Sequence, residues 1–179
     1  MDTIKVLDKK FKKFLSEEEI LAQVKRVAQE INRDYEGKKP LFLCVLNGSF
    51  MFASDLLKEI TLECNIHFVK LASYEGVIST GKVREVIGIS QPLKGRDVIV
   101  VEDIVDTGVT MEHMLETLGT REPNSIQVCT LLCKPGKLQV DLDLKYVAMN
   151  IPDDFIVGYG LDYDGCGRNY RDIYKVCED

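Results

Sequence analysis

Two spacings of hydrophobic residues alternate along this chain, and their alternation predicts a mixed α/β fold. Behind the sequence Ser16-Glu-Glu-Glu, apolar side chains recur every three or four positions, which predicts a capped amphipathic helix that ends at Gly37. Residues 51–60 and 111–118 are also expected to be helical. Apolar runs without this spacing predict strands at 40–46, 65–72, 83–90, 98–101, 126–133, 146–149 and 155–157.

The run Val98-Ile-Val-Val101 consists of four β-branched apolar residues in succession. Such a strand suits a parallel sheet that helices cover on both faces, and the intervening helices supply right-handed crossovers. We therefore expect one domain over residues 1–179, with a mainly parallel, twisted sheet flanked by helices and a core at about 37–133. The chain ends, about 1–15 and 134–179, are expected to pair into a small hood over the sheet.

Composition narrows the class of protein. The chain is 45% hydrophobic and has a net charge of -6, which suits a compact core and argues against a nucleic-acid groove. The basic run from Lys9 to Lys13 is expected to be a solvated face. No apolar stretch approaches the ~18 residues of a membrane span. The six cysteines lack the spacing of a zinc site. Because the N-terminus also lacks the apolar region of a signal peptide, we expect a cytoplasmic protein with reduced thiols.

An acidic cluster follows residues 98–101. Glu102 and Asp103 are expected at the carboxyl end of that strand, where open α/β sheets bind ligands. The turn Asp106-Thr-Gly-Val-Thr110 then offers hydroxyls and backbone N–H groups at a helix start, which is typical of an anion site. Two other interpretations exist: solvated acids with Asp106 as a helix cap, or the Walker B strand of an ATPase. Residues 76–82 match the P-loop spacing GxxxxGK, but Val83 replaces the Ser or Thr that would bind Mg²⁺.

This stretch resembles the signature of the type I phosphoribosyltransferases: an apolar strand, two adjacent acids, two apolar residues and Asp-Thr-Gly-x-Thr. The resemblance implies the fold of that family. It also implies that Glu102 and Asp103 face the ribose 2′- and 3′-hydroxyls and hold Mg²⁺. Hydroxyls and N–H groups suit a phosphate, and carboxylate acceptors suit vicinal diols. The residues that would surround the 5′-phosphate of 5-phosphoribosyl 1-diphosphate (PRPP) are Asp106, Thr107, Gly108, Val109 and Thr110.

Two further segments resemble parts of the same family. Leu46-Asn-Gly-Ser49 resembles the pyrophosphate loop of the 6-oxopurine enzymes, where the backbone N–H groups of Leu46, Asn47 and Gly48 would bind the diphosphate. Family members often have a cis peptide here, which would join Leu46 to Asn47, and Asn47 replaces a commoner lysine. Ser73-Tyr74 resembles the catalytic lid, which would exclude water from an oxocarbenium-like transition state. Taken alone, the two segments would be an ordinary Asn-Gly turn and a surface loop.

Two later segments, Leu131-Leu-Cys-Lys134 and Phe155-Ile-Val-Gly-Tyr-Gly-Leu-Asp-Tyr163 with Arg168, resemble the purine site of the hypoxanthine-guanine phosphoribosyltransferases. By that resemblance Lys134 would donate to O6 of the purine, Phe155 would stack on the base, and the Ile156 backbone would meet the base's amide edge. Asp162 would hold a second Mg²⁺ through water, and Arg168 would touch the pyrophosphate and count as catalytic. Without the resemblance, Lys134 would be a solvated strand-end lysine and Phe155 a core aromatic residue.

The resemblance implies a purine salvage enzyme that transfers the 5-phosphoribosyl group of PRPP to N9 of hypoxanthine, and of guanine. Asp106 is the candidate general base, because the purine must lose a proton as N9 bonds to carbon. Lys134 would reject adenine, whose amino group offers no acceptor. A xanthine-preferring enzyme and a PRPP-sensing regulator are the alternatives. Relatives form dimers or tetramers, so a homodimer or homotetramer is expected. The stretch Gly165-Cys-Gly167 departs from the bulkier residues of many relatives, and the sequence does not explain it.

Overall fold

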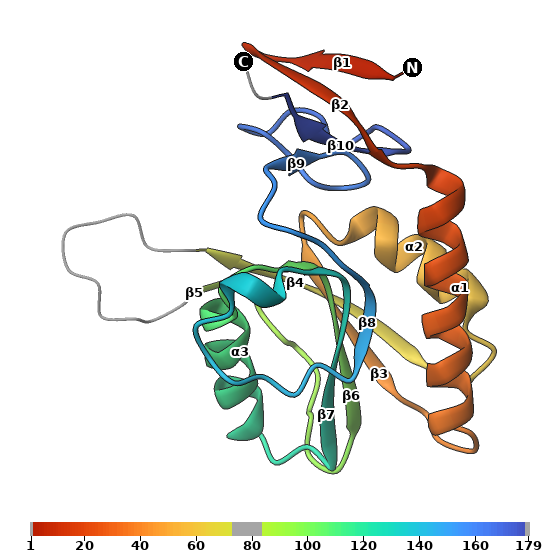
Figure 1. Cartoon of the computed structure of the whole chain (residues 1–179). Coiled ribbons are helices and arrows are strands. Elements are labelled where there is room, and N and C mark those ends of the chain that lie inside the picture. Colours follow the sequence, from red (N-terminus) through yellow and green to blue (C-terminus); the bar gives the residue numbers. More distant parts are fainter. Residues whose placement is uncertain (1, 73–83, 178–179) are drawn as a thin grey trace.

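A computed structural model of the chain describes residues 2–72 and 84–177, which form two β-sheets and the helices that cover the larger one. The larger sheet has the strand order β5-β4-β3-β6-β7-β8. Its strands are parallel except for β5, which pairs antiparallel with β4 (Figure 1). This arrangement confirms the mainly parallel α/β fold expected from the sequence. The strand bounds are Leu41–Leu46 (β3), Asn65–Ala72 (β4), Arg84–Ile87 (β5), Asp97–Val105 (β6), Ser125–Cys133 (β7) and Tyr146–Asn150 (β8).

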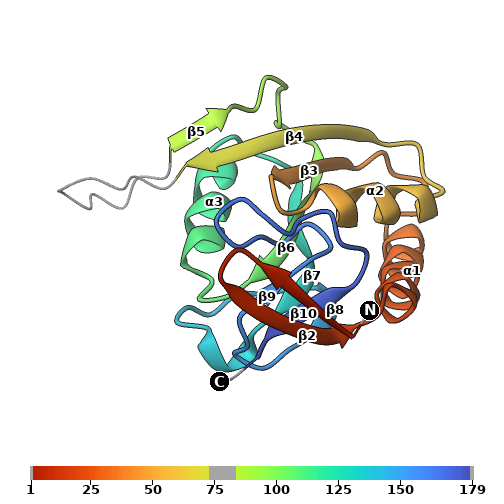
Figure 2. The ribbon, with the colours of Figure 1, turned by 90° about the horizontal axis from the view of Figure 1, so that it is seen from above.

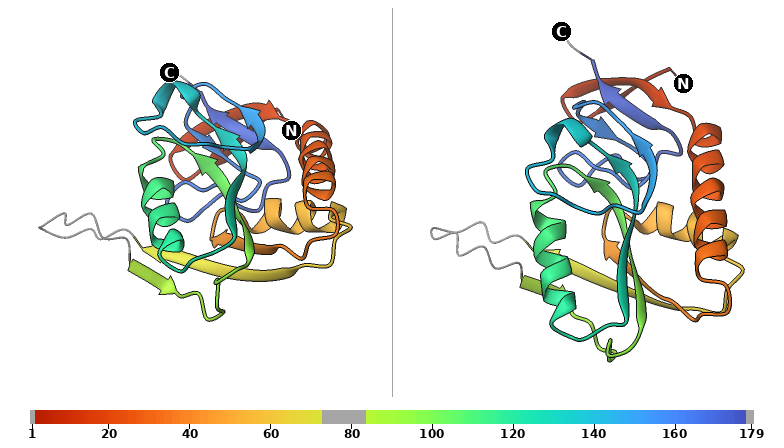
Figure 3. Two further views of the ribbon diagram at one scale, coloured as in Figure 1. Left: turned by 90° about the horizontal axis from the view of Figure 1, so that it is seen from below. Right: turned by 60° about the horizontal axis from the view of Figure 1, so that its bottom comes forward.

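Helices cover both faces of this sheet, and Figure 3 shows α1 and α2 on one side and α3 on the other. Alternate residues of β3 explain why both faces are apolar. Phe42 and Cys44 pack in the layer of α1 and α2, whereas Leu41 and Leu43 pack in the layer of α3. A strand buried on both faces reads as a continuous apolar run, as predicted for residues 98–101. The helix bounds are Glu17–Asp34 (α1), Phe50–Glu59 (α2) and Val109–Gly119 (α3).

The first helix begins where its sequence predicts. Ser16 is the N-cap of α1, and its hydroxyl oxygen accepts from the Glu19 N–H at 3.2 Å. Glu19 returns the contact by accepting from the Ser16 backbone N–H at 2.8 Å, which completes a capping box. The apolar stripe of α1, which includes Ile20, Val24 and Ile31, is buried against the sheet.

The two chain ends form a second, smaller sheet in the order β1-β2-β10-β9, with every pair antiparallel. Figures 1 and 2 show this sheet over the carboxyl ends of the parallel strands. It has a core of its own around Phe11, which is fully buried although lysines surround it in the sequence. We call it the hood sheet. Its strands are Thr3–Val6 (β1), Lys9–Leu15 (β2), Ile156–Val157 (β9) and Ile173–Val176 (β10).

Three differences from the expected elements affect the site. β6 continues past Glu102 and Asp103, because its pairing with β7 extends to Val105 and Cys133. The two acids therefore lie within the strand and not beyond its end. β8 is an edge strand of the larger sheet, although it falls in the range 134–179 expected to form the hood. A 3₁₀ turn, η1 (Pro135–Lys137), follows β7.

The surface and the thiols follow the expectations from composition. Lys9, Lys10 and Lys12 are exposed on β2. All six cysteines are free, and burial raises the pKa of the Cys44 thiol to about 12. Within residues 2–72 and 84–177, no helix is both long enough and apolar enough to cross a bilayer.

Candidate functional site

Glu102 and Asp103 form a compact acidic pair in β6. The Asp103 backbone N–H donates to Glu102 Oε1 at 3.1 Å, and the Ile104 N–H donates to Asp103 Oδ1 at 2.8 Å. Burial and the neighbouring Asp103 carboxylate raise the pKa of Glu102 well above its usual value, and burial also raises the pKa of Asp103. Both carboxylates are therefore costly to ionise without a nearby cation.

Such a pair fits Mg²⁺, which proteins usually bind through one or two carboxylates together with oxygens of the substrate and water. A site made entirely of protein ligands is a different case. The described part of the chain contains no group of three or more His, Cys, Asp or Glu side chains that could hold a metal. A cation at Glu102 and Asp103 would take its remaining ligands from water and substrate oxygens.

The turn after β6 has the features of an anion site. α3 begins at Val109, and its N-cap Gly108 supplies no side-chain cap. The Val109 N–H donates to Thr107 Oγ1 at 3.5 Å. The N–H groups of the first turn lie at the positive end of the helix dipole, where an anion would be stabilised. A cavity of about 120 Å³, open to solvent, borders this turn and also reaches Glu102. Its lining consists of Glu102, Ile104, Val105, Asp106, Thr107, Gly108, Thr110 and Met111.

The loop after β3 lies against Asp103. Its Leu46-Asn47 peptide bond is cis, as the resemblance implied, and the side chain of Asn47 is exposed. Ser49 is fully buried, and its hydroxyl donates to the Val45 carbonyl at 2.6 Å. A Cβ at Gly48 would overlap the Asp103 carboxylate and lie 2.5 Å from Asp103 Cγ. A glycine is therefore required for this close approach between the loop and β6.

The loop between β9 and β10 approaches the same place from the hood sheet. Arg168 donates to the Gly160 carbonyl at 2.7 Å and forms an ion pair with Asp162 at 2.8 Å. A Cβ at Gly160 would overlap the carbonyl oxygen of Gly48, so the two loops are in contact. The loop that carries Asp162 and Arg168, which is far from Leu46–Ser49 in the sequence, is thus brought beside the loop after β3.

The stretch Gly165-Cys-Gly167, which the sequence did not explain, forms a tight turn in the loop between β9 and β10. Gly165 and Gly167 have φ angles of +80° and +93°, which glycine adopts most readily. Tyr163 and Cys166 pair across the turn through backbone hydrogen bonds of 2.9 and 3.0 Å. The backbone accounts for the two glycines, and nothing in the structure explains the side chain of Cys166.

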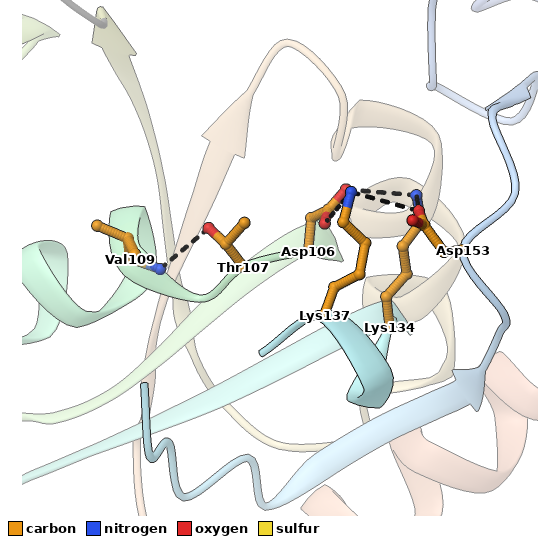
Figure 4. Close-up of polar contacts among 6 residues, drawn as sticks. All are labelled: Asp106, Thr107, Val109, Lys134, Lys137 and Asp153. Atoms are coloured by element: carbon orange, nitrogen blue, oxygen red, sulfur yellow. Dashed lines mark hydrogen bonds and ion pairs between the residues drawn. The ribbon is translucent and has the colours of Figure 1, made fainter. Parts of the chain in front are cut away.

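Lys134 follows β7, and its backbone N–H donates to the Val105 carbonyl at 3.0 Å, which fixes it beside the end of β6. Its side chain is only 8% exposed, and its ammonium lies 3.3 Å from Asp106 Oδ2 and 3.1 Å from Asp153 Oδ1. Lys137 lies 3.1 Å from Asp106 Oδ1 and 3.3 Å from Asp153 Oδ1. Figure 4 shows the four side chains converging in a ring of alternating charge. The candidate donor to the base and the candidate general base are therefore in direct contact.

Two members of this charge ring, Lys137 and Asp153, were not predicted from the sequence. Hydrogen bonding to Lys134 lowers the pKa of Asp153, and hydrogen bonding to Asp106 raises the pKa of Lys137. The sequence offered weak signals for both residues. Lys137 stands three positions after Lys134, across the 3₁₀ turn, and Asp153 stands two positions before Phe155.

Phe155 has the exposure of a residue that stacks on a ligand. It is 45% exposed, whereas Phe11 beneath it is fully buried with ring centroids 6.1 Å apart. Tyr163 meets the Phe155 ring edge-on at 5.5 Å and donates to Asp8 at 2.9 Å. Aromatic support on one side and exposure on the other suit a ring that receives a planar group. Ile156, which follows it, is buried in β9, and Ser73 and Tyr74 lie outside the described residues.

Comparison with known proteins shows the family of the chain. The family model described as the phosphoribosyl transferase domain matches residues 11–164. The chain belongs to the phosphoribosyltransferase family. The hypoxanthine-guanine phosphoribosyltransferase of Streptococcus thermophilus is 39% identical over 166 residues, which cover 92% of each chain. The enzyme of the same name from Staphylococcus aureus is 40% identical over 156 residues, or 87% of each chain.

Solved phosphoribosyltransferases share the architecture of this one. A hypoxanthine-guanine phosphoribosyltransferase from Bacillus anthracis, with a HEPES molecule in its active site, is 40% identical with a TM-score of 0.87 over 93% of this chain and 96% of that chain. The hypoxanthine phosphoribosyl transferase of Trypanosoma cruzi is 34% identical with a TM-score of 0.89 over 97% and 95%. The resemblance and the fold class expected from the sequence are thereby confirmed, whereas the roles of single residues stay predictions.

Proposed function

We propose that this phosphoribosyltransferase transfers the 5-phosphoribosyl group of PRPP to N9 of hypoxanthine or guanine and releases diphosphate. The observation that carries the proposal is the 3.3 Å contact between the Lys134 ammonium and Asp106 Oδ2. It joins a donor suited to a purine O6 to a carboxylate on the turn that borders the anion site. Relatives at about 40% identity that are named for hypoxanthine and guanine support the same substrates.

Three segments would hold PRPP. The turn from Asp106 to Thr110 binds the 5′-phosphate through backbone N–H groups and hydroxyls, which suit an anion at a helix start. The N–H groups of Leu46 to Gly48 bind the diphosphate, and Arg168 contributes charge on that side. Glu102 and Asp103 accept from the ribose 2′- and 3′-hydroxyls. The contact of Gly48 with Asp103 supports this division, because it makes the proposed diphosphate and ribose subsites adjacent.

The reaction breaks the bond from ribose C1′ to a diphosphate oxygen and forms a bond from C1′ to N9 of the purine. Glu102 and Asp103, together with Asp162 through water, would hold Mg²⁺, which when bound would supply charge neutralisation for the diphosphate leaving group. Positive charge develops on the ribose between the two events, and the carboxylates of β6 offset it. Asp106 accepts the proton that the purine loses, from N7 in this scheme. Water must be kept out meanwhile, which is the role proposed for a lid that includes Ser73 and Tyr74.

Lys134 would select the base. An ammonium that is 8% exposed needs acceptors on every side, and O6 of hypoxanthine or guanine provides one. The amino group of adenine presents hydrogens instead and would leave a buried N–H unpaired. Rejection of a substrate by an unpaired buried polar group reaches about 10⁴-fold. Phe155 would stack on the base, and the Ile156 backbone would meet its amide edge.

A substrate panel tests this function directly. The purified chain is assayed with hypoxanthine, guanine, xanthine and adenine at saturating PRPP and Mg²⁺, with chelator added as a control for the metal. Turnover of hypoxanthine and guanine and loss of turnover with chelator are expected. Adenine turned over as fast as hypoxanthine would contradict the role of Lys134, and a higher rate with xanthine would favour the xanthine-preferring alternative. PRPP binding without turnover of any base would favour the PRPP-sensing regulator.

The proposal includes a homodimer or homotetramer in the cytoplasm. For the enzyme of Trypanosoma cruzi, the C-terminal region has a role in the oligomeric state and in enzymatic activity. In this chain the last strand, β10, lies between β2 and β9 in the hood sheet. Light scattering of the purified protein would distinguish a monomer from the proposed assemblies.

A further inference from the structure

The ammonium of Lys134 lies between two carboxylates that come from different parts of the chain. Asp106 belongs to the turn after β6, and Asp153 belongs to the connection between β8 and β9. Their oxygens lie 3.3 and 3.1 Å from Lys134 Nζ. The lysine itself is 8% exposed, whereas Asp153 is 60% exposed. The Lys134 ammonium is therefore buried, whereas Asp153, one of its two partners, is accessible to water.

The two carboxylates use two of the three N–H groups of the Lys134 ammonium. A lysine has three donors and no acceptor, and rotation about its last carbon–nitrogen bond leaves their directions undefined. Two partners fix that rotation. With one N–H directed to Asp106 and one to Asp153, the third points in a single direction and stays available to an acceptor. An ammonium with only one partner would have no such fixed direction.

Lys137 keeps the two carboxylates in place from the other side. Its ammonium lies 3.1 Å from Asp106 and 3.3 Å from Asp153, so each carboxylate meets two lysines and each lysine meets two carboxylates (Figure 4). The ring is electrically balanced. Because Lys137 also contacts Asp106, the carboxylate of Asp106 keeps a cation when Lys134 directs an N–H elsewhere.

The position of Asp153 in the chain connects this ring to the proposed base platform. Asp153 precedes Phe155 by two residues, so the segment that holds the Lys134 ammonium also carries the exposed aromatic ring. The next residue, Asp154, faces elsewhere and pairs with Lys175 of β10 at 3.3 Å. Two adjacent aspartates in one connection thus have separate partners, one in the charge ring and one in the hood sheet.

We propose that Asp153 is a positioning residue for the purine: it fixes the Lys134 ammonium so that one N–H points at the acceptor on the base. The proposal rests on the function proposed above and adds a residue that acts through Lys134 without touching the substrate. Without Asp153, the Lys134 ammonium would move toward Asp106 and pair with that carboxylate alone. The enzyme then loses affinity for the base, and the carboxylate that should accept a proton carries a tighter ion pair.

The test is the steady-state kinetics of Asp153→Asn, with Asp154→Asn as the matched control. We expect the KM for hypoxanthine to rise about three- to tenfold in Asp153→Asn, because the lost contact is charged but 60% exposed. The KM for PRPP is expected to stay within about twofold, because the phosphate turn is untouched. The ratio of kcat/KM for hypoxanthine to that for adenine should fall. Asp154→Asn should leave all three quantities unchanged.

A conservative variant separates positioning from folding. Asp153→Glu keeps the carboxylate on a longer arm, so it should recover part of the lost affinity for hypoxanthine, whereas a purely structural defect would not be recovered. Equal KM values for hypoxanthine in wild type, Asp153→Asn and Asp154→Asn would overturn the inference, as would equal rises in the KM for base and PRPP. A wild-type chain that does not convert hypoxanthine would instead overturn the proposed function, so the two failures are distinguishable.

Discussion

Replacement of Gly48 by alanine tests the contact between the proposed diphosphate and ribose subsites. The new Cβ would overlap the Asp103 carboxylate and lie 2.5 Å from Asp103 Cγ, whereas ordinary contacts begin at 3.4 Å. The carboxyl carbon must therefore retreat by about 1 Å. That shift breaks the 2.8 Å hydrogen bond from the Ile104 N–H to Asp103 Oδ1, which is a bond to an ionisable group.

The magnitudes follow from this single displacement. Loss of a hydrogen bond to a charged group costs about 1.5–3 kcal/mol. For a domain of this size each kcal/mol shifts the melting temperature by about 2–4 °C, so Gly48→Ala should lower it by about 3–12 °C. A displacement of about 1 Å in a group that positions the substrate can reduce the rate about 100-fold, so kcat/KM for PRPP should fall by that order.

The matched control is Gly119→Ala. A Cβ at Gly119, the last residue of α3, meets no atom within 4 Å. We expect its kinetics to equal those of wild type and its melting temperature to be equal or slightly higher, since alanine loses less entropy on folding. The assays are thermal unfolding followed by circular dichroism and initial rates at varied PRPP. Wild-type kcat/KM for PRPP in Gly48→Ala would refute the proposal that Asp103 and the loop after β3 bind one substrate.

Four further variants, one of them a control, probe other parts of the proposed function and of the fold. Asp106→Asn should reduce kcat about 100-fold or more while calorimetry shows PRPP binding retained, and lost binding with normal chemistry would remove Asp106 as the base. Glu102→Gln should stabilise the ligand-free protein increasingly as pH rises, because burial raises the Glu102 pKa above its usual 4.5 and ionisation then costs stability. Urea unfolding at pH 5 and pH 8 measures this, and an equal difference at both values would contradict it. Tyr159→Phe removes a partly buried 2.6 Å hydrogen bond to Asp55, which joins the loop between β9 and β10 to α2. The free energy of unfolding should fall by about 1.5–3 kcal/mol, and by less for the exposed bond of Tyr163 in Tyr163→Phe.

The larger sheet could be predicted because its signals are local. The apolar run from Val98 to Val101 predicts a strand that is buried on both faces. The pair Ser16 and Glu19 predicts the start of α1. The hood sheet carries no such signal. In β2, the buried Phe11 lies between exposed lysines, so the strand has no continuous apolar run. β10 belongs to the sheet because it pairs with β2 and β9, and these pairings cannot be seen in its own sequence. The sequence predicted a hood from the two chain ends and a strand at 155–157, where β9 lies, but it did not predict β1, β2 or β10.

The site residues also fall into two groups, those that a local sequence pattern predicts and those that only the folded chain brings together. The turn from Asp106 to Thr110 is one continuous segment with its own chemistry, so it stands out in the sequence. The charge ring does not, because Lys137 and Asp153 acquire a role only when the 3₁₀ turn and the connection after β8 fold beside Asp106. Equally, the length of β6 depends on how far β7 pairs with it, which a single strand cannot reveal. Contacts between segments distant in sequence are what the structure adds.

The most direct test of the account is to identify the product formed from hypoxanthine, PRPP and Mg²⁺. Mass spectrometry and phosphorus NMR would measure the nucleotide and the diphosphate in one reaction. The account predicts inosine 5′-monophosphate, linked at N9, and diphosphate in equal amounts. Diphosphate with ribose 5-phosphate and unchanged hypoxanthine, or no consumption of PRPP at all, would contradict it.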